Sequence, residues 1–343
     1  MKIPEPTNST ISEIYKIYTK RREKPRQYLG WSQIGRSCER ELWLSFRFAF
    51  NNTFDGRMLR LFDTGFREEA RIISELRDIG CTVECIDKAT GKQIGVESFG
   101  GHLRGHVDAI VKGFVEAPKT PHLMDVKTCS VKNFEKVIKD GMQKTYPVYW
   151  AQAHGYMGKL GLTRGAYIFV CKDDERIHIE RFEYDAAVFE KYEKRAESII
   201  FSDRIPPPIS TDPSWYECKW CSAHDLCHGS KLTQNVNCRT CAHSTAERDG
   251  TWSCAQYDAT IPDLDAQLAG CAAHILHPDL TPWQYKPSEH GVIWMTPHGE
   301  IENGVSAAGV FDSLEIVANP QACAQPDKFV AETREIFGAK VMG

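Results

Sequence analysis

An aspartate and a lysine stand two residues apart in a stretch with the pattern of a short strand, residues 123–128. Because side chains alternate along a strand, Asp125 and Lys127 are expected on one face, with Met124 and Val126 on the other. A carboxylate beside an ammonium group can hold a divalent metal ion and orient a water molecule, but it can also be a solvated ion pair. The triplet therefore indicates hydrolytic chemistry only if other polar residues converge on it.

A second aspartate interrupts the strand pattern that precedes this stretch. Asp108 follows Gly105-His106-Val107 and stands among apolar residues, whereas a lone strand aspartate usually marks a turn or a sheet edge. If the two strands are neighbours, Asp108 and Asp125 come together at one edge of the sheet. Two carboxylates in that arrangement would suit a metal ion with oxygen ligands.

A glutamate lies on an apolar helix face further upstream. The helix is predicted to start with Asp63 or Thr64 as its cap and to end at Gly80. Glu69 falls in the middle of the apolar stripe, which consists of Phe66, Ile72, Ile73, Leu76 and Ile79. A carboxylate there is costly unless it is paired or binds metal, so Glu69 is either a salt-bridged residue or a metal ligand.

The remaining pattern alternates strands with helices, which predicts an α/β fold. A helix that starts near Pro147 carries Gln152 and Tyr156, four residues apart on one face. The segment 31–44 reads as another helix with Ser32 as its cap, and the proline-rich run 205–209 breaks regular structure.

Two groups of cysteines have the spacing of metal ligands. The first is C-x₂-C-x₅-C, one ligand short of a four-thiolate site, and Cys38 is the natural fourth; the second is C-x₂-C-x₁₂-C-x₁₆-C and reads as a zinc ribbon or knuckle. The two groups are Cys38, Cys218, Cys221 and Cys227, and Cys238, Cys241, Cys254 and Cys271. Zinc held by the three later cysteines and by Cys38, His224 or His228 is an alternative for the first group. For the second, His243 or His274 could replace a ligand, and iron–sulfur is the alternative. Cys81, Cys85, Cys129, Cys171 and Cys323 read as packing residues.

Taken in order, the polar residues resemble the RecB-like branch of the PD-(D/E)xK nuclease superfamily. That branch has a helical His or Glu, a strand Asp, a strand with Asp/Glu-x-Lys and a helix with Gln-x-x-x-Tyr. The matching blocks are 65–69, 105–108, 125–128 and 152–156, with Glu69 where many members have His. The resemblance implies a restriction-endonuclease-like mixed sheet flanked by helices, followed here by a small cysteine-rich C-terminal module.

The resemblance also implies roles for the site residues. Asp108 and Asp125 would bind Mg²⁺ or Mn²⁺, with the Val126 carbonyl and Glu69 completing the shell, and Lys127 would position the attacking water. Gln152 and Tyr156 would contact DNA or brace the site, and Arg36 and Arg40 are expected to contact DNA.

The first cysteine group is similar to that of the iron–sulfur nucleases in this branch, AddB and the CRISPR-associated RecB-like nucleases. In those proteins one cysteine precedes the nuclease core and three follow it. The resemblance implies a [4Fe–4S] cluster that joins the two ends of the domain, with a structural role.

Composition is that of a globular protein of 343 residues, with no apolar run of membrane-spanning length. We expect it in the cytoplasm of a bacterial or phage-infected cell, where clustered cysteines favour metal over disulfides. From Cys238 onward there are 6 Lys+Arg against 14 Asp+Glu, a net charge of −8, while residues 1–237 carry +4. The acidity of this end argues against DNA contact, and it leaves two interpretations: a surface that binds a protein partner, or a cap on the nuclease domain.

The expected organisation is a basic segment (1–30), a nuclease domain (31–230), a zinc-ribbon-like module (237–280) and an acidic α/β tail (281–343). The predicted function is metal-dependent DNA hydrolysis, as an exonuclease acting on DNA ends or single strands in recombination, repair or processing. A non-catalytic DNA-binding subunit that keeps the fold is the alternative, and a metal-storage or redox protein is a third interpretation.

Overall fold

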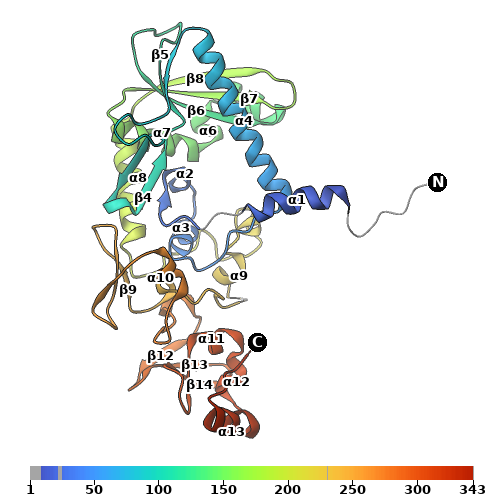
Figure 1. Cartoon of the computed structure of the whole chain (residues 1–343), viewed down its shortest axis with the longest axis vertical. Coiled ribbons are helices and arrows are strands. Elements are labelled where there is room, and N and C mark those ends of the chain that lie inside the picture. Colours follow the sequence, from blue (N-terminus) through green and yellow to red (C-terminus); the bar gives the residue numbers. More distant parts are fainter. Residues whose placement is uncertain (1–8, 22–24, 230, 343) are drawn as a thin grey trace, which may run out of the picture. The chain divides into compact units, whose positions relative to one another are not determined.

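The computed structural model describes residues 9–21, 25–229 and 231–342. The chain divides into two compact units (Figure 1), of which the first comprises residues 1–36 and 53–196 and the second residues 37–52 and 197–343. The predicted basic segment is only partly covered, since its residues 1–8 and 22–24 lie outside the described residues. No helix in the described part of the chain is long and apolar enough to cross a membrane.

The first unit contains a five-stranded mixed sheet in the order β2-β5-β6-β7-β8 and a small sheet in the order β1-β4-β3. Only β6 and β7 are parallel in the larger sheet. The strands are β1 (Leu29–Gly30), β2 (Thr82–Glu84), β3 (Gly95–Ser98), β4 (Leu103–His106), β5 (Ala109–Lys112), β6 (His122–Cys129), β7 (Arg164–Cys171) and β8 (Ile177–Glu183). The helices are α1 (Thr10–Lys20), α2 (Trp31–Ile34), α4 (Gly56–Asp78), α5 (Val131–Asp140), α6 (Met142–Thr145), α7 (Pro147–Leu160) and most of α8 (Ala186–Ile200), with a 3₁₀ turn η1 (Phe99–Gly101). This is the predicted mixed sheet flanked by helices.

Helix α4 covers one face of the large sheet. Its buried residues Ile72, Ile73 and Leu76 pack in one core with Met124 and Val126 of β6. The helix starts earlier than predicted, because the Asp55 side chain accepts from Met58 N at 2.7 Å and caps it. The predicted stripe is wrong at its ends, since Phe66 is 69% and Ile79 67% exposed. The hydrophobic core beneath α4 therefore covers only part of the length of the helix.

The predicted helix 31–44 is interrupted in the structure. Its first turn is α2, which starts after Gly30, so Ser32 is not its cap. The chain then turns at Gly35, where a Cβ would come 2.6 Å from Val148 Cα at the start of α7. Glycine is required there because α2 and α7 approach closely. A separate helix, α3 (Glu39–Phe46), begins after Cys38 and belongs to the second unit.

Residues 37–52 belong with the second unit because polar groups tie α3 to the chain after α8. Trp43 Nε1 donates to Ser202 O at 2.9 Å, and Arg47 Nη1 donates to Arg239 O at 3.3 Å. The division of the chain therefore falls at Ala196 within α8, earlier than the predicted domain end at residue 230. Two stretches distant in sequence form one folded unit, which a linear domain assignment does not represent.

The second unit holds two further sheets, in the orders β11-β10-β9 and β12-β13-β14-β15. Its strands are β9 (Ser244–Ala246), β10 (Trp252–Cys254), β11 (Ala259–Ile261), β12 (Gln284–Pro287), β13 (Gly291–Thr296), β14 (Gly299–Gly304) and β15 (Val310–Phe311). Besides α3 its helices are α9 (His224–Cys227), α10 (Leu264–Ala269), α11 (Ser313–Ala318), α12 (Pro320–Ala324) and α13 (Lys328–Phe337), with 3₁₀ turns η2 (Cys218–Trp220), η3 (Cys238–Thr240) and η4 (Pro278–Leu280).

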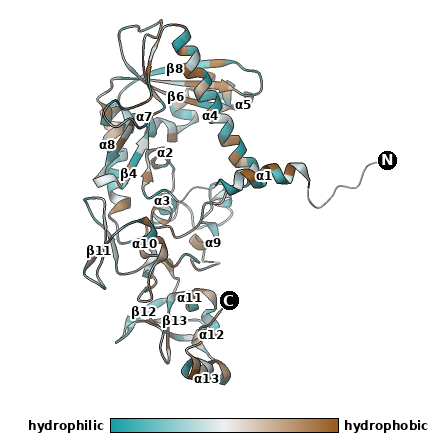
Figure 2. Cartoon of the chain, viewed as in Figure 1, coloured by the Kyte–Doolittle hydropathy of each residue, from teal (hydrophilic) through white to brown (hydrophobic). Residues whose placement is uncertain are grey.

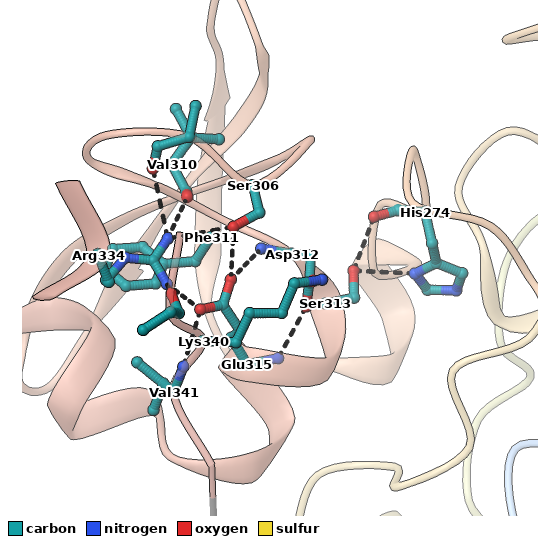
Figure 3. Close-up of polar contacts among 12 residues, drawn as sticks. His274, Ser306, Val310, Phe311, Asp312, Ser313, Glu315, Arg334, Lys340 and Val341 are labelled. Atoms are coloured by element: carbon teal, nitrogen blue, oxygen red, sulfur yellow. Dashed lines mark hydrogen bonds and ion pairs between the residues drawn. The ribbon is translucent and has the colours of Figure 1, made fainter. Parts of the chain in front are cut away.

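A buried ion pair holds the C-terminal helix in place (Figure 3). The carboxylate of Glu315, on α11, accepts from Arg334 of α13 and from Val341 N at 2.9 Å. The Arg334 guanidinium also stacks over Phe311 at 4.2 Å. The acidic tail is therefore a folded module, and one of its carboxylates is neutralised internally.

Candidate active site

The Asp-x-Lys triplet lies in the middle of β6. Asp125 is 2% exposed, and its Oδ1 accepts from Lys127 Nζ on the same strand face. The flanking Met124 and Val126 face the opposite way, into the core beneath α4. The two faces of β6 thus separate packing from chemistry.

Asp108 stands directly beside this triplet. It precedes β5, whose first residue, Ala109, pairs with Met124 of β6. Its Oδ2 accepts from the backbone N–H of Val126 at 3.1 Å. The adjacent antiparallel strands therefore bring the two aspartates together, as predicted. The predicted position at a sheet edge is wrong, because β2 and the pair β7-β8 extend the sheet on either side of β5 and β6.

Helix α7 supports Asp125 from the other side. The helix starts with Pro147 in its first turn and ends at Gly161 in the left-handed region. Gln152 Nε2 donates to Asp125 Oδ2 at 3.3 Å and to the Tyr156 hydroxyl at 3.1 Å. Both oxygens of Asp125 therefore have protein donors in this arrangement.

Tyr156 explains the glycine that precedes Asp108. A Cβ at Gly105 would overlap the Tyr156 ring, so only glycine lets β4 pass this side chain. Gln152 and Tyr156 are 6% and 2% exposed. Such burial favours bracing of Asp125 over direct contact of these two residues with DNA.

Two tyrosines that sequence reasoning missed surround Lys127. Its Nζ lies 5.2 Å from the ring centroid of Tyr149 and 5.8 Å from that of Tyr167. Tyr149 is three residues before Gln152 on α7, and Tyr167 pairs with Asp125 across β6 and β7. The helical spacing between Tyr149 and Gln152 could have indicated that Tyr149 faces the site. The position of Tyr167 could not be predicted, because it depends on the parallel pairing of β6 and β7. Both rings hold the ammonium group by cation–π attraction.

The charges of this site act strongly on one another. Burial raises the pKa of Asp125, Lys127 opposes that rise, and Asp108 adds to it. Burial on its own would lower the pKa of Lys127, but the Asp125 and Asp108 charges more than offset it, so the pKa is raised. The neighbouring carboxylates therefore favour the protonated form of Lys127.

Glu69 completes the group from α4. Burial raises its pKa to about 7, the charge of Asp108 adds to the rise, and Lys127 opposes it. The carboxyl group thus lies within electrostatic reach of both residues. Three carboxyl groups thus act electrostatically on a single ammonium group, and an added cation would reduce their mutual repulsion.

The donor set fits a hard divalent cation, since carboxylate and carbonyl oxygens are the ligands that Mg²⁺ and Mn²⁺ prefer. The residues concerned are Glu69, Asp108, Asp125 and the Val126 carbonyl. As they stand, no three His, Cys, Asp or Glu side chains within the described residues are grouped closely enough to hold an ion. The positive charge beside Asp125 is supplied by Lys127.

Comparison with known proteins decides the family. The sequence profile of the PD-(D/E)XK nuclease superfamily matches residues 36–228, more than half of the chain. The chain belongs to the PD-(D/E)XK nuclease superfamily. The match contains every oxygen donor above and confirms the restriction-endonuclease-like fold.

Solved structures similar to this PD-(D/E)XK chain include the protein SSO0001, with 14% identity, 64% of this chain and 96% of that chain covered, and a TM-score of 0.38. An alkaline exonuclease from Laribacter hongkongensis is 18% identical, with 55% of this chain and 89% of that chain covered and a TM-score of 0.34. A phage-related exonuclease from Haemophilus somnus is 15% identical, with 47% of this chain and 77% of that chain covered and a TM-score of 0.33. No curated protein matches the chain.

The first cysteine group of this PD-(D/E)XK protein gathers within the second unit. All thirteen cysteines are free thiols. Burial is the main cause that raises the pKa of Cys218 and Cys221, and the charges of Cys38 and Cys227 contribute to both. The four thiols therefore lie within electrostatic reach of one another.

The second group surrounds a pocket. Cys238, Cys241, Cys254 and Cys271 line it together with His243 and His274. Burial raises the pKa of Cys238 to about 11, and the other three cysteines add to the rise. A neutral thiol is the stable form there without metal, and a bound cation would favour the thiolate.

Of the two arginines expected to contact DNA, Arg40 is engaged within the second unit. Its Nε donates to Pro206 O at 2.7 Å, and its Nη1 lies 3.9 Å from Cys227 Sγ. This geometry favours a role in holding the proline-rich segment beside the cysteines. For Arg36, DNA contact stays a prediction.

The Glu69 carboxyl group is expected to make the metal-free protein less stable as the pH rises from about 5 to 8. Its pKa is raised from 4.5 to about 7, so between these values the folded protein holds the proton more tightly than the unfolded chain. The resulting stabilisation is complete below the lower value and is lost as the pH rises through the upper one. Glu69→Gln should remove this share of the pH dependence.

Thermal melts in EDTA at pH 5, 6, 7 and 8 would measure it. The melting temperature of Glu69→Gln relative to the wild type should increase with pH. Glu75→Gln is the matched control, because Glu75 lies on the same helix in an exposed ion pair with Arg71. Parallel curves for the wild type and Glu69→Gln would contradict the argument.

Proposed function

We propose that the chain is a divalent-metal-dependent deoxyribonuclease that removes nucleotides from DNA ends. The observation that carries the proposal is the convergence of Asp108, Asp125 and Lys127 on one sheet face, with Gln152 bonded to Asp125. Such an activity would serve DNA recombination, repair or processing. A subunit that only bound DNA would not need this buried, electrostatically costly group.

Each side chain has a distinct part in the proposed reaction. Asp108, Asp125, Glu69 and the Val126 carbonyl would hold Mg²⁺ or Mn²⁺, which when bound would neutralise phosphate charge and acidify water. Lys127, kept protonated, would orient the attacking water and stabilise its deprotonated form. Gln152 fixes Asp125 Oδ2, and Tyr156 fixes Gln152.

A [4Fe–4S] cluster is proposed on Cys38, Cys218, Cys221 and Cys227. Support comes from the shared neighbourhood of these thiols and from their position on either side of the nuclease core. A cluster there would connect α3 to the chain after α8 without entering the reaction. Zinc remains the alternative ion for the same thiols.

A zinc ion is proposed on Cys238, Cys241, Cys254 and Cys271. The pocket that these residues line is supported by the hairpin of β9 and β10 and by η3. Two thiolates from a C-x₂-C turn and two from later segments are the usual arrangement of a structural zinc site.

The tail, residues 281–343, is proposed to bind a protein partner and not DNA. Its net charge is negative, and α13 exposes apolar side chains, of which Phe329 and Phe337 are the largest. A polyanion would be repelled from such a surface, whereas a protein could cover it.

The function is tested with protein purified without oxygen and DNA labelled at the 5′ or the 3′ end. With Mn²⁺ we expect release of short products from linear strands and none from covalently closed circles. EDTA should abolish it. Binding of DNA without hydrolysis under Mg²⁺, Mn²⁺ or Co²⁺ would instead support the non-catalytic DNA-binding subunit.

A further inference from the structure

The apolar stripe of α4 continues beyond the core that it covers. Phe62, Phe66, Glu69, Ile73 and Leu76 follow one another at intervals of four, three, four and three residues, so they lie along one face of the helix. The last two are buried, whereas Phe62 and Phe66 are 42% and 69% exposed. Glu69 stands at the boundary. The exposed half of the stripe therefore leads directly to the proposed metal site.

The exposed half is aromatic and open. Phe62 contacts Phe54 edge to face, with ring centroids 5.1 Å apart, and the two residues are 42% and 49% exposed. Gly65 lies between the phenylalanines in sequence, and a Cβ there would meet nothing within 4 Å. A glycine inside a helix is destabilising relative to alanine. Packing does not require it at this position, and it leaves space beside Glu69.

The basic residues on this half of α4 lie on another side of the helix. Hydrophilic and hydrophobic residues alternate along α4 (Figure 2). Arg57, Arg60 and Arg67 are exposed, and at 3.6 residues per turn they lie on the side of the helix opposite Phe62 and Phe66. Arg67 pairs with Asp63 at 2.9 Å at an exposed site, where such a pair is weak. Guanidinium groups can take phosphate oxygens from such positions. The aromatic face formed by Phe62 and Phe66 is therefore complementary to the bases of a nucleic acid, not to its phosphates.

The spacing selects an unpaired strand. Phe66 and Glu69 are three residues apart, a rise of about 4.5 Å along the helix, so a base on Phe66 would be close to a phosphate at the metal site. Bases in a duplex are stacked on each other and present no free face to a side chain. Unpaired bases stack readily on aromatic rings, whatever their sequence.

From these observations, and on the basis of the proposed function, we propose that Phe62 and Phe66 form a base-stacking platform. It would hold the unpaired nucleotides of a DNA strand beside the metal site and so favour single-stranded or frayed ends over paired DNA. The two phenylalanines are positioning residues, because they would hold the substrate without touching the reacting phosphate.

The platform is tested on the full-length protein by alanine and conservative variants. Two quantities are measured: the Kd for a fluorescein-labelled 20-nucleotide poly-dT strand in Ca²⁺, and KM and kcat for single-stranded and blunt duplex DNA in Mn²⁺. Phe66→Ala should raise the Kd and KM for the single strand about 5- to 150-fold, with kcat nearly unchanged. Phe66→Trp should retain binding, and Phe66→Leu should not.

Ile79→Ala is the matched control, because Ile79 is 67% exposed at the far end of the same helix. It should leave all constants unchanged. Both truncations remove exposed side chains, so the melting temperature should stay that of the wild type. A change in it would assign the loss to folding and overturn the platform.

Several results would overturn the proposal. One is a double variant Phe62→Ala, Phe66→Ala whose Kd and KM for the single strand stay within twofold of the wild type. Another is a Phe66→Ala variant that loses affinity for duplex DNA as much as for the single strand. A third is full binding of the single strand by Phe66→Leu. A change of mass in light scattering with DNA binding intact would also overturn it, since the face would then bind a second copy of the chain, aided by the exposed Ile14 of α1. A wild type that hydrolyses no DNA would overturn the proposed function, whereas the Kd in Ca²⁺ would still decide the platform.

Discussion

Replacement of Asp125 by asparagine is expected to reduce metal-dependent DNA hydrolysis at least about a thousandfold, because the ion contributes several kcal/mol to transition-state stabilisation. The amide has the shape of the carboxyl group it replaces, and Asp108 remains beside Lys127. The metal-free variant should therefore stay folded. Wild-type protein should gain thermal stability on addition of Mn²⁺, and Asp125→Asn should lose most of that gain.

Lys127→Met separates the two roles that we assign to the triplet. Hydrolysis should fall as much in Lys127→Met as in Asp125→Asn. The thermal stabilisation by Mn²⁺ should remain, since Lys127→Met removes no oxygen ligand. Asp140→Asn is a matched control, because Asp140 pairs with Lys144 at 3.5 Å on the surface of the same unit. Undiminished hydrolysis by both Asp125→Asn and Lys127→Met would refute the assignment of this site.

Replacement of Cys38 by serine is expected to remove the brown colour of the anaerobically purified protein, which should otherwise absorb broadly near ~400 nm. Iron content should fall from about four atoms per chain. The cluster would close a loop of more than 170 residues between Cys38 and Cys218, and a cross-link of that length stabilises by about 5 kcal/mol in the chain-entropy description. The melting temperature should therefore drop by roughly 10 °C or more.

Two cysteine variants serve as comparisons for Cys38→Ser. Cys85→Ser, in the first unit, should keep iron and melting temperature, because Cys85 belongs to neither group. Cys254→Ser should remove about one zinc ion and keep the iron. Metal analysis that finds only zinc, about two ions per chain, would refute the cluster and leave the nuclease assignment intact.

Local pattern predicted the strand of Asp125 and the helices that carry Glu69 and Gln152. It did not predict helix α1 within the basic segment, and it misjudged where helices begin and how far the core extends. The helix around Glu69 was expected to start at Asp63 or Thr64, whereas α4 starts after Asp55. Its first turns pack on α1, and Tyr15 lies so close that Gly56 has no room for a side chain. That contact joins segments about forty residues apart, so no local pattern could reveal it.

Burial was the second point that local pattern could not settle. Helical periodicity correctly placed Phe66 and Ile73 on one face, but periodicity does not say where the sheet beneath that face ends. The sheet covers Ile73 and leaves Phe66 exposed. The misjudged residue is the one on which the stacking proposal now rests.

By itself, the sequence determined the order of the polar residues, the alternation that separates Asp125 and Lys127 from the core, and the α/β class, because these depend on spacing along single strands and helices. Only the tertiary structure decided which groups neutralise one another. Gln152 bonded to Asp125, two tyrosine rings around Lys127 and α3 joined to the second unit all depend on segments brought together from distant parts of the chain. Electrostatic interaction and burial depend on distances in space, so the pKa shifts of the site could not be derived from the sequence without the fold.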